Sequence, residues 1–281
     1  MIIDGREISS RYEQRIKDVI NKHTNLGYRK PRLVIFLLSE DLASQKYVSL
    51  KEKKGQELGI DVVIYKNIDM DNVLQVLDTI KHDSNIDGIM VQLPVGEKYT
   101  RDSILKEIPE SKDVDGLSPN TLGAIFHGKE EYFLSATAKG ITIMLNENNI
   151  NIEGKNVVII NSSIEIGLPL SAYFISKHAT VQICNSKTQN LADKTREADI
   201  LITATGVAHL IKEDMVKQDS IVIDCGYSFK DNKLYGDVDF DNVSKKTSLI
   251  TPVPGGVGPM TITSLFLNLI DSYLRNILDG K

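Results

Sequence analysis

The feature that most constrains the fold of this chain is a repeated alternation between two hydrophobic periods. Short, continuous apolar runs such as residues 32–38 (RLVIFLL) have the length of buried strands, and segments with helical periodicity follow them. Strands that alternate with helices in this way indicate βαβ units and a parallel sheet. The sequence therefore predicts an α/β fold built from mainly parallel sheets with flanking helices.

The alternation runs in two series, separated by an irregular stretch at residues 95–134 that is rich in glycine and proline. The expected strands lie at residues 32–38, 60–65, 87–93, 156–160, 180–184, 199–205 and 220–226. A final helix is expected at residues 260–278. Because 281 residues suffice for about two domains, we predict two lobes, the second of them a Rossmann-like nucleotide-binding lobe.

Composition excludes several classes of protein. The net charge of −5 argues against a nucleic-acid partner, since general nucleic-acid binders are more often basic. The apolar runs are too short to cross a membrane, and the first residues lack the pattern of a secretory signal. Two cysteines, Cys184 and Cys225, cannot form a disulfide scaffold. We therefore expect a cytoplasmic protein without a membrane or nucleic-acid partner.

In the first series, Tyr47 and Lys51 are spaced to share one face of a helix. A lysine that lies beside an aromatic ring in a cleft loses solvent, which disfavours its ammonium form and makes it a usable general acid or base. The alternative is a solvated helix face, because Lys46, Lys53 and Lys54 lie close by. Spacing alone favours that alternative.

Gln92 stands at the carboxyl end of an expected buried strand and is followed by Leu93 and Pro94. This is where α/β proteins bind ligands. The alternative is a glutamine that bonds to backbone as the strand leaves the core. The sequence does not separate the two interpretations.

Residues 112–116 read KDVDG and place Asp113 and Asp115 on either side of a valine. Two carboxylates could contribute to a metal site, but without a histidine or further acidic residues the signal for a metal is weak. Capping of the glycine turn is the favoured interpretation, and we predict no metal.

Two further segments belong to the second half of the chain. Residues 251–261 (TPVPGGVGPMT) form a rigid loop whose backbone can approach a ligand and which opens onto a helix whose N-terminus suits an anion. We favour a binding role for it. Residues 161–169 (NSSIEIGLP) follow an expected strand and would place backbone amides at a helix start, although the glycine motif G-x-G-x-x-G is absent.

Taken together, these segments resemble the bifunctional methylenetetrahydrofolate dehydrogenase/methenyltetrahydrofolate cyclohydrolase family over nearly the whole chain. The carriers, in order, are ASQKYVSLKEKKGQELGI, DGIMVQLP, KDVDGL, IGLPLSAYF, NSKT, ATG, IVIDCG, GDVDF and TPVPGGVGPMT. The YVxxK spacing, KDVDG and the last loop are highly specific as a set.

The resemblance implies two linked reactions at an active site in a cleft between the lobes. Oxidation of 5,10-methylenetetrahydrofolate would use NADP, with NAD as the alternative, and hydrolysis would then give 10-formyltetrahydrofolate. Residues 1–120 and 260–281 would form the folate-binding catalytic lobe, and residues 136–255 the NAD(P)-binding lobe. The family also implies a homodimer.

The resemblance further assigns roles to residues. Lys51 would be the catalytic lysine, Tyr47 would stack on or flank the folate ring, Gln92 would position Lys51, and Asp115 would bind the pterin edge. The other residues implied to bind substrate are Leu93, Pro94, Gly255, Gly256 and Pro259. Those implied to bind the dinucleotide are Asn161, Ser162, Ser163, Ile164, Ser186, Lys187, Thr205, Gly206 and Thr261. Neither step requires a metal.

The sequence departs from the family pattern in the second lobe. Residues 161–163 read Asn-Ser-Ser where the family usually has Gly-Arg-Ser, so the arginine that would contact the NADP 2′-phosphate is missing and Lys187 is the candidate to replace it. Residues 135–138 read Ser-Ala-Thr-Ala where Pro-Cys-Thr-Pro is usual. These departures motivate one alternative, a cyclohydrolase whose dinucleotide lobe has decayed. An alternative from another class is a non-catalytic folate-binding or interaction protein.

Overall fold

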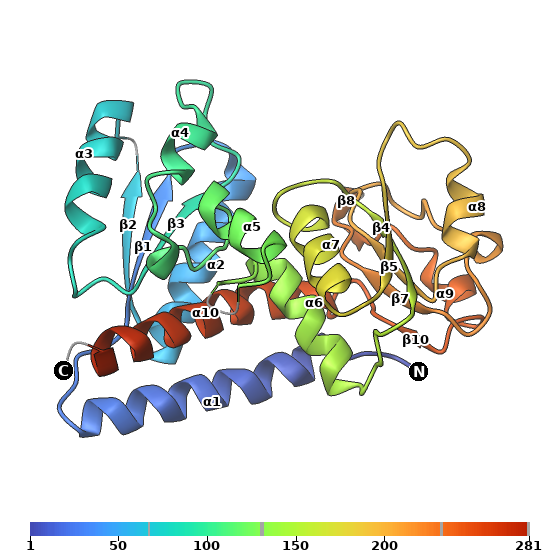
Figure 1. Ribbon diagram of the computed structural model, residues 1–281, viewed down its shortest axis with the longest axis horizontal. Helices are drawn as coiled ribbons and strands as arrows, with labels where there is room; N and C mark the ends of the chain where they lie inside the picture. The colour runs from blue at the N-terminus through green and yellow to red at the C-terminus, as the bar shows by residue number, and fades with distance from the viewer. Residues whose placement is uncertain (67, 130–131, 231–232, 280–281) are drawn as a thin grey trace. The chain divides into compact units, whose positions relative to one another are not determined.

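The computed structural model describes residues 1–66, 68–129, 132–230 and 233–279 (Figure 1). The chain divides into two compact units. The three-stranded unit comprises Arg11–Ala136 and Ile262–Lys281, and the five-stranded unit comprises Met1–Ser10 and Thr137–Thr261. The first ten residues thus pack in the second unit, whereas the sequence grouped them with the first lobe.

The three-stranded unit contains a parallel sheet with the strand order β2-β1-β3. Its strands and the helices that connect them are β1 (Arg32–Leu37), α2 (Leu42–Leu58), β2 (Asp61–Lys66), α3 (Met70–Ile80) and β3 (Gly88–Gln92). All five were expected within a few residues. The first crossover leads from the central strand β1 to β2, and the second passes from β2 to β3 on the other side of β1. The carboxyl ends of β1 and β3 therefore meet at one edge of the sheet.

Helix α2 has clear local start and stop signals. The side chain of Asp41 accepts a hydrogen bond from the Ser44 backbone N–H, which satisfies one of the amides that a helix start leaves unpaired. The helix ends at Gly59, whose φ of 85° lies in the left-handed region that favours glycine. These two caps set the length of the helix that carries Tyr47 and Lys51.

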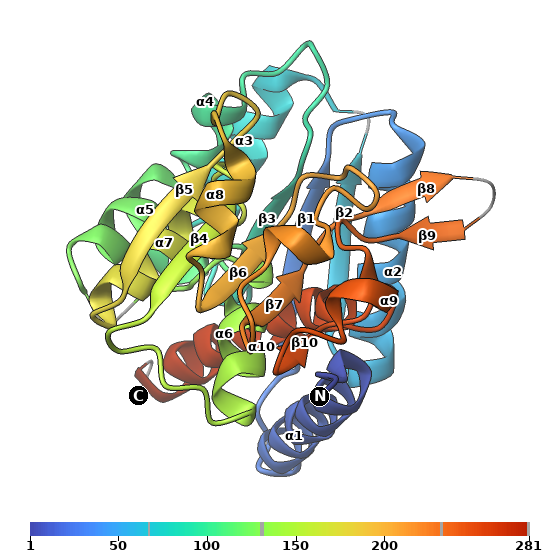
Figure 2. The ribbon, with the colours of Figure 1, turned by 90° about the vertical axis from the view of Figure 1, so that its right-hand side faces the viewer.

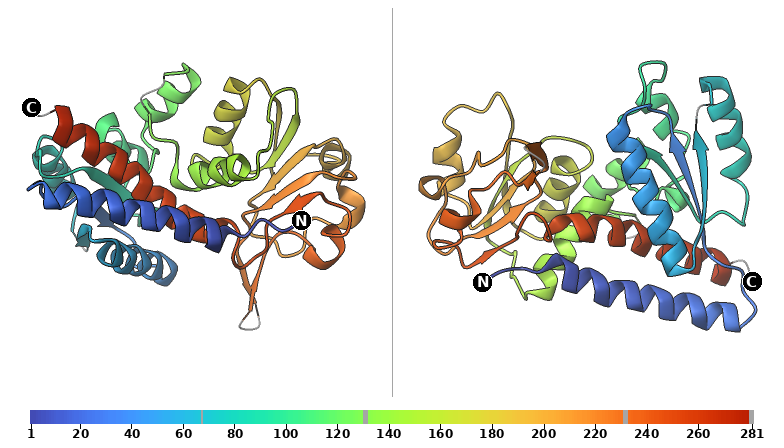
Figure 3. Two further views of the ribbon diagram at one scale, coloured as in Figure 1. Left: turned by 90° about the horizontal axis from the view of Figure 1, so that it is seen from below. Right: turned by 180° about the vertical axis from the view of Figure 1, so that it is seen from behind.

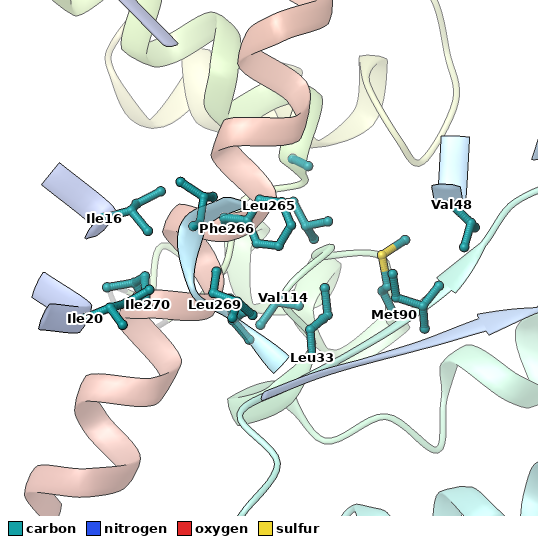
Figure 4. Close-up of a cluster of buried hydrophobic side chains, with 14 of the residues drawn as sticks. Ile16, Ile20, Leu33, Val48, Met90, Val114, Leu265, Phe266, Leu269 and Ile270 are labelled. Carbon is teal, nitrogen blue, oxygen red and sulfur yellow. The ribbon is translucent and has the colours of Figure 1, made fainter. Parts of the chain in front are cut away.

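One face of this sheet is covered by three helices. Helices α1 (Gly5–Asn25) and α10 (Val257–Asp279) run side by side (Figures 1 and 3) and pack with α2 against β1. The buried side chains that form this core are Ile16, Ile20, Leu33, Ile35, Leu37, Val48, Leu58, Ile60, Met90, Val114, Ala136, Leu265, Phe266, Leu269 and Ile270 (Figure 4). Removal of this apolar surface from water is the main term that stabilises the unit.

The irregular stretch at residues 95–134 contains more regular structure than the sequence indicated. It holds α4 (Arg101–Leu105), a 3₁₀ turn η1 (Glu110–Lys112) and α5 (Pro119–Phe126). The amphipathic segment at residues 121–126 predicts a short helix, which is α5, whereas α4 and η1 are too short to show a helical period. The η1 turn delivers residue 113 to an isolated bridge with Ile89 of β3.

The five-stranded unit contains a parallel sheet with the order β10-β7-β6-β4-β5. Its strands are β4 (Asn156–Ile160), β5 (Thr180–Cys184), β6 (Ile200–Thr203), β7 (Ile221–Asp224) and β10 (Leu249–Ile250). The helices α6 (Ala136–Glu147), α7 (Gly167–Ser176) and α8 (Leu191–Arg196) precede or connect the first of them. The chain crosses from β4 to β5 on one side and returns to β6 on the other, which makes the carboxyl ends of β4 and β6 the topological switch point of a doubly wound sheet. The Rossmann-like prediction is confirmed.

Sequence reasoning missed five small elements of this unit, of which two are β10 and a 3₁₀ turn η2 (Glu213–Met215). The antiparallel hairpin of β8 (Ser228–Lys230) and β9 (Lys233–Tyr235) extends away from the large sheet (Figure 2), and α9 (Phe240–Val243) follows it. Strands of three residues that are largely exposed carry no continuous apolar run, so periodicity does not find them. Among the described parts of the chain, we find no helix with the length and apolar character of a membrane span.

Candidate active site

The structure brings Lys51 and Gln92 into contact. The Nζ atom of Lys51 donates a hydrogen bond of 2.9 Å to Oε1 of Gln92 and lies 3.8 Å from Sδ of Met90. Lys51 stands on α2, which leaves the carboxyl end of β1, and Gln92 is the last residue of β3. The sheet edge where these strands end therefore gathers residues that are 41 positions apart in the sequence.

Burial lowers the pKa of Lys51, and the negative charge of Asp115 opposes that effect in part. A lysine whose ammonium form is disfavoured gives up its proton more readily, which suits a group that exchanges protons during a reaction. The solvated-face interpretation is thus wrong for Lys51, although it holds for the exposed Lys46 and Lys53. Lys54 is half-buried and forms an ion pair with Glu13.

Tyr47 lies one helical turn before Lys51 and leaves 38% of its surface exposed. On a helix, residues four apart project from the same face. An exposed aromatic ring next to a half-buried lysine offers a flat apolar surface on which a planar ligand can stack.

Gln92 bonds to the backbone, as one of the two interpretations expected, and it also contacts Lys51; its role in binding a ligand stays a prediction. Its Oε1 accepts from Lys51, and its Nε2 donates to the backbone oxygen of Leu93 at 2.8 Å. This pair of bonds fixes the amide orientation, because only the oxygen can accept from an ammonium group. Leu93 is half-buried, the exposed Pro94 follows, and the peptide bond between them is cis.

The two aspartates of KDVDG lie in different environments. Asp113 is 1% exposed, and its carboxylate accepts hydrogen bonds from the backbone N–H groups of Leu117 and Ser118. Turn capping is therefore the correct interpretation for Asp113. Asp115 is half-buried, and its charge acts on Lys51. In the described residues, no group of three or more histidine, cysteine, aspartate or glutamate side chains is arranged to hold a metal ion.

In the five-stranded unit, Asn161 joins the turns that follow β4 and β6 at the switch point. Its Nδ2 donates to the Ala204 oxygen at 2.9 Å, and its Oδ1 accepts from the backbone N–H groups of Ser163 and Gly167 at 2.8 and 3.0 Å. A Cβ atom on Gly167 would stand 1.9 Å from the backbone oxygen of Asn161, so only glycine permits this approach of α7 to β4. Dinucleotide-binding folds use a glycine for the same close packing.

The loop after β6 is held by Asp237, which sequence reasoning did not single out. Its Oδ2 accepts from Oγ1 of Thr203 at 2.7 Å and from the Thr205 N–H at 2.6 Å, and its Oδ1 accepts from the Val207 N–H at 3.1 Å. Gly206, at the centre of this loop, has a φ of 71°. The GDVDF segment was the available signal, because an aspartate between apolar residues in a core must find donors.

Asp224 lies beside Asp237 and is also buried. Its carboxylate accepts from the backbone N–H groups of Gly226, Asp237 and Val238. Burial raises the pKa of Asp224 to about 6, and the charge of Asp237 adds to that shift while the backbone hydrogen bonds oppose it. Burial also raises the pKa of the Cys225 thiol, which disfavours its reactive thiolate form.

The remaining predicted residues occupy exposed or loop positions. Ser162 is exposed and Ile164 half-buried in the turn after β4. Ser186 and Lys187 are exposed in the turn after β5, where Oδ1 of Asn185 accepts from the Lys187 N–H. This turn contains no carboxylate that could bind the hydroxyls of an NAD ribose.

The loop at residues 251–261 is shorter than expected. Helix α10 begins at Val257, so Pro259 lies in its first turn, where a missing backbone N–H is tolerated. Gly255, with a φ of 113°, and Gly256 are buried, and a Cβ atom on Gly5 would stand 1.8 Å from the Gly256 oxygen. Gly256 thus packs closely against Gly5, and Gly255 has a backbone conformation that favours glycine. Further along, Oγ1 of Thr261 lies 3.3 Å from Oγ1 of Thr137.

Comparison with known proteins decides the family. Residues 3–115 match the model of the tetrahydrofolate dehydrogenase/cyclohydrolase catalytic domain, and residues 135–277 match the NAD(P)-binding domain of the same family. This chain belongs to the tetrahydrofolate dehydrogenase/cyclohydrolase family. The resemblance read from the sequence is confirmed.

Individual members of the family match along their full length. The bifunctional protein FolD of Aquifex aeolicus is 40% identical over 278 residues, which cover 98% of this chain and 96% of the relative. The crystal structure of the bifunctional enzyme FolD from Campylobacter jejuni superposes with a TM-score of 0.94 at 39% identity, over 98% of this chain and 99% of that one. The Trypanosoma brucei enzyme, complexed with NADP and an inhibitor, gives a TM-score of 0.92 at 27% identity, over 99% and 98% of the two chains.

Proposed function

We propose that this chain oxidises 5,10-methylenetetrahydrofolate to the 5,10-methenyl compound with NADP and hydrolyses that product to 10-formyltetrahydrofolate. Both domains of the family are matched, and relatives at 40% identity are named as bifunctional enzymes. The observation that carries the proposal is the desolvated Lys51, held by Gln92 and facing the charge of Asp115. These residues suit a reaction that moves a proton.

The dehydrogenase step needs two bound molecules in the correct orientation. NADP, when bound, supplies the acceptor for the hydride. The residues at the switch point fit such a group, because the close Gly167–Asn161 approach and the loop braced by Asp237 leave two ordered turns at the strand ends. The residues that we propose to contact it are Ser162, Ser163, Ile164, Ser186, Lys187, Thr205, Gly206 and Thr261, with Asn161 shaping the turn.

This order in the turns argues against the cyclohydrolase-only alternative. A lobe that no longer binds a dinucleotide has no reason to keep Gly167 at a position where any added Cβ atom would clash. Nor has it a reason to keep the buried Asp237, which bonds to the backbone of Thr205 and Val207. The substitution of the family arginine by Ser162 affects the choice of cofactor and leaves the loops in place.

The hydrolysis step adds water to the methenyl carbon, opens the ring at N5 and releases one proton. Lys51 in its neutral form takes a proton from the attacking water and returns one to N5 as the carbon–nitrogen bond breaks. Gln92 directs the amine by accepting one of its hydrogen bonds, Tyr47 flanks the folate ring, and Asp115 binds the pterin edge. We propose that Leu93, Pro94, Gly255, Gly256 and Pro259 complete the substrate site.

The cleft between lobes, the homodimer and the cytoplasmic location remain predictions.

Substitution of Lys51 tests this assignment. We expect Lys51→Ala and Lys51→Arg each to lower the rate of methenyltetrahydrofolate hydrolysis by roughly 10²- to 10⁴-fold, because neither side chain exchanges a proton near neutral pH. Loss of the methenyl absorbance measures the rate. Lys53→Ala, an exposed lysine on the same helix, is the matched control and should retain full activity. A Lys51→Ala enzyme with wild-type cyclohydrolase activity would refute the role of Lys51.

A further inference from the structure

The KDVDG turn is braced from three sides within the three-stranded unit. Asp113 is joined to β3 by a bridge to Ile89, and its carboxylate accepts from the Leu117 N–H at 3.3 Å and the Ser118 N–H at 2.8 Å. These bonds close the backbone on both sides of Asp115. The carboxylate of Asp113 is therefore committed to the shape of the turn.

Gly116 supplies the second constraint. Its φ is 67°, and a Cβ atom there would stand 2.4 Å from the Phe133 oxygen and 2.8 Å from the Ser135 nitrogen. No other residue fits between the turn and this neighbouring backbone without displacing one of them. Gly116, the residue after Asp115, is thus fixed against the backbone of residues 133–135.

The third constraint is Asn268 of α10, which is fully buried. Its Nδ2 atom donates to the Val114 oxygen at 2.8 Å and to the Leu134 oxygen at 2.9 Å. One amide therefore ties the residue before Asp115 to the same neighbouring segment. Buried bonds of this kind are costly to lose, because the carbonyls would remain unpaired.

We propose that Asp113 is a positioning residue, which acts through the turn that it closes to hold the Asp115 carboxylate opposite Lys51. Neither Asp113 nor Asn268 needs to touch a substrate for this role. The inference rests on the proposed function only for its effect on catalysis, since the geometry concerns the protein alone.

The surroundings of Lys51 make the proposal measurable. Met90 and Gln92 of β3 are its neutral contacts, and Asp115 supplies the charge that opposes its burial. Lys54, on the next turn of α2, is paired with Glu13 and Glu57. Substitution of Asp113 can therefore change the charge felt by Lys51 in two ways, by displacing Asp115 or by removing the charge of Asp113 itself, and the variants below separate them.

The test is an NMR titration of the Lys51 side chain in the full chain labelled with ¹³C and ¹⁵N lysine, with the Lys51 signals assigned from Lys51→Arg. We expect Asp115→Asn to lower the Lys51 pKa, because the opposing charge is gone. Asp113→Ala should lower it in the same direction. Asp113→Asn should lower it less, because the amide oxygen can still accept from Ser118. A direct effect of the Asp113 charge would instead give equal shifts for both Asp113 variants.

A double-mutant cycle makes the test decisive. In the Asp115→Asn background, Asp113→Ala should cause no further shift of the Lys51 pKa. A shift of equal size in both backgrounds, or no shift with Asp113→Ala in the wild-type background, would overturn the proposal. Asn268→Leu, which frees the turn without touching Asp113, supplies a second route to the same result if Asp113→Ala does not fold.

Asp87→Asn is the control for general loosening. Asp87 is a fully buried carboxylate of the same unit that bonds to Arg29 and to the Arg32 N–H. Its substitution should reduce stability and leave the Lys51 pKa unchanged; an equal shift of the Lys51 pKa in Asp87→Asn would count against a specific role for Asp113.

In the enzyme assay, Asp113→Ala should lower kcat for methenyl hydrolysis by roughly 10- to 100-fold. Because the titration needs no turnover, it remains informative if the proposed function fails.

Discussion

At the scale of single residues, the structure separates carboxylates that a sequence presents alike. Asp113 and Asp115 are two positions apart, yet one closes a turn and the other faces a lysine. Asp224 and Asp237 lie in apolar strand-like segments, and both are saturated with backbone donors. The donor environment of each carboxylate therefore indicates its role, and residue type alone does not.

The pKa of Asp224 predicts a pH dependence of stability. Because burial raises this pKa from 3.8 to about 6, the folded state keeps a proton that the unfolded chain releases. The stability that this proton provides is present below pH 4 and is lost as pH rises towards 6, at a cost of about 3 kcal/mol. The free energy of unfolding of Asp224→Asn, minus that of the wild type, should therefore increase over this range in urea titrations. A pH-independent difference would contradict the assignment.

Ser162 offers a prediction about cofactor choice. This residue is exposed in the turn after β4, so a long side chain fits without repacking. Ser162→Arg should raise the ratio of kcat/KM for NADP to that for NAD by roughly 10- to 100-fold, because a guanidinium pairs strongly with a 2′-phosphate. Ser162→Met, similar in length but uncharged, is the control. An equal rise with methionine would show that charge is not the cause.

Much of the proposed site could be named from the sequence, whereas its supports could not. Tyr47, Lys51, Gln92 and Asp115 stand in specific motifs at strand ends or on the following helix. Asp237 and Asn268 act through contacts more than 30 residues away, which no local spacing reveals. The double role of Gln92 is likewise a matter of tertiary geometry.

At the scale of elements, the strands with continuous apolar runs were predicted well, and β1, β3, β4 and β6 have these runs because almost all of their side chains are buried. The hairpin of β8 and β9 and the short helix α4 were not predicted, since each spans too few residues to show a hydrophobic period. Helix α10 begins three residues earlier than expected because Gly258 and Pro259 are tolerated in a first turn.

Two buried serines of α10 give a matched test of how this helix packs. Oγ of Ser264 has no hydrogen-bond partner among the described residues, whereas Oγ of Ser272 lies 2.5 Å from the Asp87 oxygen and 2.8 Å from the Ser111 oxygen. Ser264→Ala should raise the free energy of unfolding by about 1 kcal/mol, and Ser272→Ala should lower it by about 1 to 2 kcal/mol. Denaturant titrations measure both. Equal losses would contradict the packing described.

At the scale of the whole molecule, the sequence predicted two parallel-sheet lobes but neither the strand order nor the place of the first residues. Strand order depends on pairing between distant segments, which hydrophobic periods do not encode. The first residues join the five-stranded unit because Ile2 forms a bridge with Ile250 of β10 and the amino terminus bonds to the Ser248 oxygen. The catalytic domain of the family nevertheless begins at residue 3, in line with the grouping that proximity in sequence suggested.

The central claim is that one chain performs both reactions. The most direct measurement gives a single purified preparation 5,10-methylenetetrahydrofolate with NADP, and in parallel with NAD, while NADPH or NADH formation and 10-formyltetrahydrofolate are followed together. The account predicts reduction of NADP that saturates with cofactor and is accompanied by the 10-formyl product, with the methenyl compound alone also hydrolysed. Hydrolysis of the methenyl compound without reduction of either cofactor would contradict it.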